Sequence, residues 1–177
     1  MYTSMAASVA IAWLIIRLVA GLTLAAHGAQ KLLGWFEGPG VDKWEQVLAA
    51  QGMKPGRVWA WLNIVGELGG GLSLAFGFLT PFGAAGALGA MFMAIVKSHW
   101  RNGFFNSKRG LEFPLALMAM GTAVGLAGPG PISLDQLFGI NLLYPLLFII
   151  LALVALAVDI VGLYISRPAP EPSASQA

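Results

Sequence analysis

A few polar side chains occur within long apolar stretches of this chain, where the residues next to them in sequence offer few hydrogen-bond or ion-pair partners. Glu67 lies in the apolar run from Trp59 to Leu79, and a carboxylate in the middle of a membrane helix is a candidate functional group by default. His27 interrupts an earlier apolar run. A histidine near a carboxylate can take up and release a proton, as quinone chemistry or proton-coupled transport requires. Glu67 and His27 are therefore the candidate catalytic residues.

A larger set of polar residues is expected to share one interior ligand-binding site. Arg17 and Lys31 fall on the same face of the first apolar segment, with His27 beside that face, because their spacing follows the helical period. Asn63 lies one turn before Glu67 on the same face of the next segment. A helix whose polar groups form a single stripe turns that stripe away from lipid. The candidate ligand-binding residues are Arg17, His27, Lys31, Asn63, Glu67, Lys97 and His99.

Simpler interpretations of these residues stay open at this point. Arg17 could extend to the outer headgroups, and the basic residues Lys31, Lys97 and His99 could be interfacial anchors. Glu67 could be a structural partner of His27 or Arg17, or a protonated, hydrogen-bonded group. A rise of ~1.5 Å per residue places Glu67, His27 and Asp159 about 10–15 Å from the cytoplasmic helix ends, and Arg17 at about 25 Å. Arg17 then reaches Glu67 only if helix tilt or its long side chain closes a gap of about 10 Å.

Metal and thiol chemistry find little support in the sequence. The two histidines, His27 and His99, differ by roughly 9 Å in expected depth, which disfavours haem ligation by the pair. Ligands for zinc or iron do not occur at suitable spacing. The chain has no cysteine and cannot itself relay electrons through thiols. We therefore expect no metal site.

Composition predicts an all-α integral membrane protein. Apolar residues make up 58% of the chain and charged residues only 10%, against about 25% charged in a typical soluble domain. Apolar periodicity and length predict five membrane-spanning helices. Pro81 alone separates the second from the third, which predicts a tight hairpin. A cleaved signal peptide is disfavoured because Arg17 interrupts a run that is also too long. The expected spans are 8–33, 57–79, 82–100, 112–127 and 142–166.

The basic residues predict the orientation of the chain. Every lysine and arginine except Arg17 follows or flanks the same ends of the predicted spans. The positive-inside rule places those ends in the cytoplasm, with the amino terminus outside and the carboxyl terminus inside. Because the positive charges lie in flanking loops and not in one patch, nucleic-acid binding is not expected.

The connecting segments and small residues give further expectations. Residues 42–51 predict a short amphipathic helix, which is either a membrane-surface helix anchored by Trp44 or a lid over a cavity. The polar and aromatic stretch 101–110 suits the membrane interface, and the tail 167–177 is expected to be disordered. The Gly66-x-x-x-Gly70 and Gly121-x-x-x-Gly125 motifs predict close helix packing within the chain, with homo-oligomerisation as the alternative.

The ordered set of motifs resembles the DoxX family of small bacterial membrane proteins. The resemblance covers about residues 13–135 and implies a four-helix membrane core over 1–135. The segment 136–166 is then an additional transmembrane helix, which the family does not explain and which carries Asp159. The matching polar positions are Arg17, His27, Lys31, Glu67, His99 and Glu112. The motifs are Arg17, Gly21, His27-Gly28-x-x-Lys31, Glu67 with Gly69-Gly70, Gly77-x-x-Thr80, His99, Gly110-x-Glu112-x-Pro114, and a Gly128-Pro129-Gly130 turn before Ser133-Leu134-Asp135.

The resemblance also implies a range of functions. DoxX-like proteins are mostly of uncertain activity, and the related DoxD branch is a membrane subunit of thiosulfate:quinone oxidoreductase. The leading hypothesis is a redox-linked, quinone-facing subunit in the bacterial cell membrane, with non-covalent quinone and a soluble oxidoreductase on its cytoplasmic face. The alternatives are a non-enzymatic scaffold that docks such an oxidoreductase, and a small-molecule transporter. Transport would need alternating access, for which the sequence offers no detectable inverted repeat.

Overall fold

Helix α1 (Tyr2–Leu33) is the longest element, and several of the other helices pack against it. The computed structural model describes residues 2–166, with side chains from residue 7, and the predicted disordered tail 167–177 lies outside that range. Within it the chain is helical and has no strand. The remaining elements are α2 (Gly40–Ala50), α3 (Gly56–Ile64), η1 (Val65–Gly69), α4 (Gly70–Phe76), α5 (Thr80–Ala94), η2 (Ile95–His99), η3 (Trp100–Asn102), η4 (Asn106–Lys108), α6 (Glu112–Ala127), α7 (Leu134–Leu137) and α8 (Leu146–Ile165).

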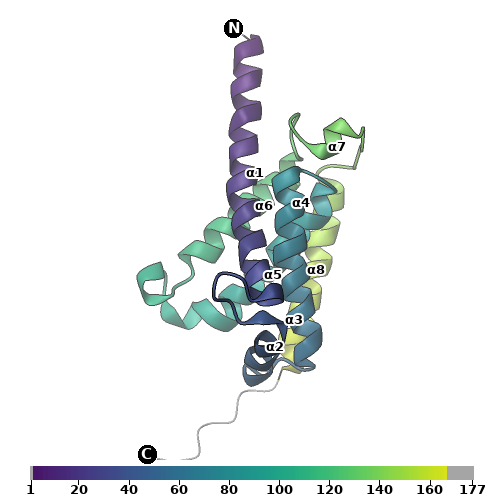
Figure 1. Cartoon of the computed structure of the whole chain (residues 1–177). Coiled ribbons are helices and arrows are strands. Elements are labelled where there is room, and N and C mark those ends of the chain that lie inside the picture. Colours follow the sequence, from purple (N-terminus) through teal and green to yellow (C-terminus); the bar gives the residue numbers. More distant parts are fainter. Residues whose placement is uncertain (1, 167–177) are drawn as a thin grey trace, which may run out of the picture.

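The helices confirm an all-α membrane bundle. Three apolar helical stretches are long enough to cross a bilayer, namely Ala7–Leu33, Thr80–Asn102 and Leu146–Ile165. Helix α6 is apolar but shorter, and α3, η1 and α4 follow one another directly as the predicted second span. Figure 1 shows α1 beginning at one end of the bundle and α8 ending at the other. The exact number of membrane crossings stays a prediction.

The connection between the second and third predicted spans differs from expectation. Helix α4 ends at Phe76, and the turn is made by Gly77 and Leu79, which both have a left-handed backbone, with φ +62° and +48°. Pro81 does not divide the spans but lies in the first turn of α5. Proline is tolerated there because the first backbone N–H groups of a helix have no intrahelical acceptor. The last span likewise begins at Leu146, directly after Pro145 and not at residue 142.

Small residues bring the helix backbones together, as the sequence predicted. Gly21 of α1 lies so close to α4 that an added Cβ would be 2.5 Å from the Gly71 carbonyl oxygen. Gly66 approaches Gly86 of α5 in the same manner, at 2.7 Å from its carbonyl oxygen. Close contact of this kind drives helix association in lipid, because the hydrophobic effect contributes little to the association there. Gly21 and Gly66 therefore serve packing within the chain.

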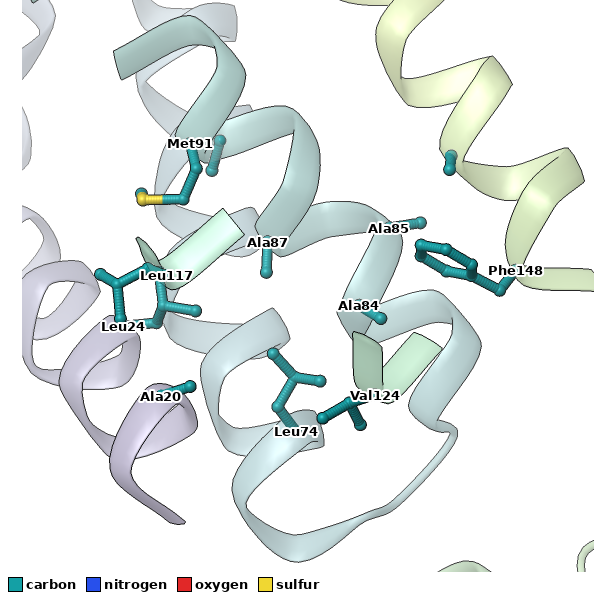
Figure 2. Close-up of a cluster of buried hydrophobic side chains, with 12 residues drawn as sticks. Ala20, Leu24, Leu74, Ala84, Ala85, Ala87, Met91, Leu117, Val124 and Phe148 are labelled. Carbon is teal, nitrogen blue, oxygen red and sulfur yellow. The ribbon is translucent and has the colours of Figure 1, made fainter. Parts of the chain in front are cut away.

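The apolar core lies where α1, α4, α5, α6 and α8 meet. Figure 2 shows Leu74 next to Val124, and Phe148 of α8 pointing toward Ala85. Phe148 also fills the space left by Gly125. The outer side of α8, by contrast, carries large exposed apolar side chains, among them Ile150, Leu153 and Ile160. Continuous exposed apolar surface of this kind suits contact with lipid.

Arg17 is a structural residue at one end of the bundle. Only 2% of Arg17 is exposed, so the interpretation that it extends to the headgroups is wrong. Its guanidinium donates hydrogen bonds to the carbonyl oxygens of Pro129, Ile132 (2.7 Å) and Ala75 (3.4 Å). One turn earlier, the Trp13 indole donates to the Gly128 carbonyl at 2.7 Å. Helix α1 thereby holds the loop that follows α6, and the guanidinium is solvated by backbone carbonyls in place of water.

Candidate functional site

A cavity of about 1010 Å³ lies between α1, α2, the α3–η1–α4 helix, α5 with η2, α6 and α8. Its wall is mostly apolar. Arg17, which the sequence grouped with the candidate ligand-binding residues, does not line it. Ligand sites are commonly apolar cavities with a few convergent polar groups, which describes this one. The other six candidates line this one cavity: His27, Lys31, Asn63, Glu67, Lys97 and His99.

Lys31 and Glu67 form an ion pair in the wall of the cavity. The Lys31 ammonium is 2.5 Å from each carboxylate oxygen of Glu67. Glu67 is only 1% exposed. The expectation that Glu67 pairs with His27 or Arg17 is therefore wrong, and so is the interpretation of Lys31 as an interfacial anchor. A carboxylate this deeply buried needs a cation with good geometry, which Lys31 supplies from one turn beyond His27.

Two more residues complete a closed polar group around the ion pair. The Asn63 amide donates to Glu67 Oε1 at 3.4 Å and accepts a hydrogen bond from the Trp44 indole at 3.1 Å. The Lys31 ammonium lies over the Trp44 ring, 4.6 Å from its centroid, within range of a cation–π interaction. Trp44 belongs to α2, whose Leu48 also lines the cavity. Helix α2 thus forms part of the cavity wall, and its role as a lid stays a prediction.

The backbone departs from regular α-helix at the polar residues of the site. Glu67 is the central residue of η1, a π-helical turn between α3 and α4. Lys97 and His99 lie in η2, a second π-helical turn at the end of α5. A π turn adds one residue to the helix and rotates the side chains that follow it. Sequence periodicity assumes a constant helical period and did not reveal these turns, although such turns are frequent at functional sites.

His27 stands apart from the ion pair. Its ring packs edge-on against Phe113 of α6, with the ring centroids 5.7 Å apart. Within residues 2–166 its ring nitrogens make no hydrogen bond to the protein, although the residue lines the cavity. A histidine with free ring nitrogens at a cavity can donate to, or accept from, a bound molecule.

His99 and Lys97 lie at the end of the cavity where α5 finishes. His99 Nδ1 is 2.8 Å from the Arg109 carbonyl oxygen, and the Asn102 amide donates to the same carbonyl at 3.1 Å. His99 therefore holds the loop between η3 and α6. Glu112 also serves this loop, because its carboxylate accepts a hydrogen bond from the Asn106 backbone N–H at 2.5 Å. Lys97 has no ion-pair partner in the described part of the chain.

Comparison with known proteins identifies the family. The family model DoxX matches residues 12–100, half of the chain. The chain belongs to the DoxX family. With its long apolar helices, this DoxX protein is a multi-pass membrane protein embedded in a lipid bilayer. Searches of curated proteins and of solved structures give no match.

The DoxX match contains all six cavity-lining candidates but not every wall of the cavity. Phe113 comes from α6 and Asp159 from α8, and both lie beyond residue 100. The resemblance seen in the motifs runs on to residue 135, so its last part rests on those motifs alone. Asp159 faces the cavity from α8, and its Oδ2 is buried without a hydrogen-bond partner among the described residues. Helix α8 therefore adds a polar group to a cavity built mainly by the DoxX segment.

Several site features were missed at the sequence level. Phe113 reads as an ordinary apolar residue of α6, and nothing in its spacing indicates contact with His27. Trp44 was expected at the membrane surface, whereas its indole donates into the polar group. Among the described residues no group of three or more histidine, cysteine or acidic side chains is arranged to hold a metal ion.

Proposed function

We propose that this DoxX protein is the quinone-facing subunit of an oxidoreductase complex in the bacterial cell membrane. The observation that carries the proposal is the apolar cavity with Lys31, Glu67 and His27 in its wall. An apolar ring with a hydrocarbon tail fits such a wall, and its oxygen atoms need a small number of donors. A bound quinone would supply two-electron, two-proton redox chemistry.

The three polar residues have separable roles in this proposal. Lys31 offers three N–H donors, of which the Glu67 carboxylate occupies part, so a remaining donor can orient a carbonyl oxygen. His27 can hold a proton at a ring nitrogen that no protein group engages. Glu67 holds the Lys31 side chain in place and can exchange a proton with it. The electrons come from a soluble oxidoreductase docked on the membrane protein.

The docking surface for that oxidoreductase is proposed at the basic end of the bundle. Helix α2 is tied to that end by the Gln51–Ser98 hydrogen bond (3.5 Å) and by the Glu45–Arg57 ion pair (3.8 Å). Figure 1 shows α2 and α3 at the end opposite α7. The positive-inside rule makes this end cytoplasmic, with the amino terminus outside.

The test begins with the intact protein purified in mild detergent, with mass spectrometry of bound quinone and of co-purifying proteins. Retained quinone, or a soluble oxidoreductase in defined ratio, supports the proposal. Glu67→Gln and His27→Ala should each reduce retained quinone at least tenfold. Glu45→Gln, the same change in a surface ion pair outside the cavity, should leave it unchanged.

Other outcomes point to the alternatives. A protein partner without quinone, unaffected by Glu67→Gln, supports the scaffold function and contradicts the quinone site. A protein that carries neither quinone nor partner favours a transporter. Full quinone-linked activity in both Glu67→Gln and His27→Ala also contradicts the proposed roles.

A further inference from the structure

Helix α8 carries one carboxyl group on an otherwise apolar buried face. The buried residues of α8 are Phe148, Ala152, Asp159 and Gly162, whose spacing places them on one side of the helix. Phe148 packs on Gly125, and Gly162 receives the Trp59 ring. These contacts fix the rotation of α8, so Asp159 is held toward the cavity.

Asp159 has no partner in the described part of the chain. The residue is 8% exposed, its Oδ2 is buried, and neither a hydrogen bond nor an ion pair joins the carboxyl group to residues 7–166. A buried polar group without a partner opposes folding, and in a membrane the penalty is larger because water is absent. The structure thus carries a destabilising acceptor that lines a cavity.

Asp159 lines the cavity where α8 packs against α5. Gly89 of α5 lies opposite, where an added Cβ would be 3.1 Å from Asp159 Oδ2 and 3.3 Å from the Ala155 Cβ. Any larger residue at position 89 would crowd the carboxyl group. Lys97 is eight residues further along the same helix, about 12 Å away along its axis. Lys97 in η2, which directly follows α5, therefore does not neutralise Asp159.

The charges that line the cavity favour a neutral ligand. Lys31 and Glu67 form a closed pair, while Lys97 and Asp159 make no ion pair among the described residues. A lipophilic cation drawn to Asp159 would meet Lys97 in the same cavity. A neutral molecule can donate a hydrogen bond from a hydroxyl group to Asp159 and accept one from a lysine in the cavity wall.

We propose that Asp159 is a ligand-binding residue that accepts a hydrogen bond from a phenolic hydroxyl group. This inference rests on the proposed function and refines it: the cavity prefers the reduced, hydroxyl-bearing quinol to the oxidised quinone, which has acceptors only. No donor among the described residues pairs with Asp159, so a ligand without a hydroxyl group leaves this buried acceptor unpaired. The cavity should therefore discriminate strongly between quinol and quinone.

The test compares two probes that differ in that hydroxyl alone, 4-dodecylphenol and 4-dodecylanisole. Binding to the full chain in mild detergent is followed by tryptophan fluorescence, since Trp44 and Trp59 line the cavity. The wild-type protein should bind the phenol about tenfold more tightly than the anisole. In Asp159→Leu the preference should fall to about one, and in Asp159→Asn to about threefold because the amide N–H₂ group adds a donor that the anisole oxygen can also use. Asp42→Asn, at an exposed carboxyl outside the cavity, should keep the wild-type preference.

Each result decides between the two proposals. Equal wild-type affinities for the two probes contradict the role of Asp159 and leave the cavity as a binding site. A wild-type protein that binds neither probe contradicts the cavity function and the inference together. Asp159→Leu should melt at the wild-type temperature or above, because it removes an unpartnered buried group. If that variant does not fold, Asp159→Asn with an unchanged preference contradicts the inference.

Discussion

Lys31 of α1 and Glu67 of η1 meet side by side in the cavity wall, with the ammonium 2.5 Å from both carboxylate oxygens. Their side chains are only 14% and 2% exposed. The two residues are 36 positions apart in sequence, and their ion pair joins two helices. It therefore fixes the relative rotation of α1 and the second span, and it places the polar centre of the site.

Removal of either partner of this pair should destabilise the protein strongly. Lys31→Met leaves a buried carboxylate without a cation, and Glu67→Gln leaves a buried ammonium without an anion. Each single change should cost roughly 3–5 kcal/mol, because an uncompensated buried charge remains. Thermal unfolding in detergent, followed by intrinsic fluorescence, measures the effect as a lowered Tm.

The double variant is the internal control for this prediction. Lys31→Met combined with Glu67→Gln removes both charges, so it should unfold closer to the wild type than either single variant. Additive losses in the double variant would show that the two groups are not energetically coupled. The surface pair offers a second control, because Glu45→Gln should change the free energy of unfolding by less than about 1 kcal/mol.

Stability should fall at high pH because of Tyr144, which lies before α8. Burial, together with the nearby Asp135 carboxylate, raises the pKa of Tyr144 to about 12. Its hydroxyl donates to Asp135 Oδ2 at 3.3 Å. A phenol whose pKa is higher in the folded state than the ~10 of the unfolded chain stabilises fully below pH ~10. That contribution is lost as pH rises from about 10 to 12, so Tm should decline across this window.

Tyr144→Phe isolates the effect of the phenol. The variant lacks the titrating group, so the fall in its Tm between pH 9 and 12 should be smaller than that of the wild type. Identical pH profiles for the two proteins would contradict the assignment. The measurement needs the protein in detergent at matched ionic strength, since surface lysines also titrate in this range.

Asp135 should act as a capping residue for α5. Its two oxygens accept hydrogen bonds from the backbone N–H groups of Leu79 (2.8 Å) and Thr80 (3.2 Å), and from the Thr80 hydroxyl (2.8 Å). Asp135→Ala leaves these donors unpaired and removes a negative charge from the positive end of the helix. The free energy of unfolding should fall by about 2–4 kcal/mol. Asp135→Asn should cost less, and equal losses in both variants would argue against the cap.

The sequence predicted the helices well and the partners of the polar residues poorly. Apolar length and proline placement identified α6 at Glu112–Ala127 and the end of α1 at Leu33. Both signals are local, so one sequence contains them. Glu67 lies in a π turn, which changes the direction of its side chain, and the rotation of α1 about its own axis brings Lys31 to it. That information lies in contacts between distant segments, which periodicity does not encode.

Arg17 shows why depth alone misassigns a charged residue. Counting along the helix places it near the outer end of the span, where extension to the lipid headgroups is one of the open interpretations. The structure supplies backbone carbonyls from the loop after α6 instead. Glycine and proline in that loop indicated a turn, yet they do not indicate which helix the turn folds against. A buried cation can be satisfied by main-chain oxygens that have no sequence signature.

Glycine-to-alanine variants should test the helix packing directly. Gly21→Ala places a methyl group against the backbone of Gly71 and Ala75, with atoms at 2.5 Å that cannot move without separating α1 from α4. We expect a loss of about 1–3 kcal/mol in the free energy of unfolding. Gly121→Ala is the matched control, since its nearest neighbour would be a Leu74 methyl at 3.6 Å. That variant should be neutral or slightly stabilising, because alanine favours a helix.

A further control separates packing within the chain from packing between chains. If these glycines served an oligomer interface, Gly21→Ala would change the oligomeric state in detergent at unchanged Tm. We expect the reverse, a lowered Tm with the same mass by light scattering.

Arg17 should be essential for the folded structure of the loop after α6 and dispensable for ligand binding. Arg17→Met leaves the carbonyls of Pro129 and Ile132 without their donor, which should cost about 2–4 kcal/mol and expose the loop 128–133 to proteolysis. Arg17→Lys should restore less than half of this loss, because one ammonium cannot reproduce the guanidinium fork. Folded Arg17→Lys should bind 4-dodecylphenol with wild-type affinity, since Arg17 does not line the cavity. Normal protease resistance of the loop in Arg17→Met would contradict the structural role, and a selective loss of phenol affinity would move Arg17 into the site.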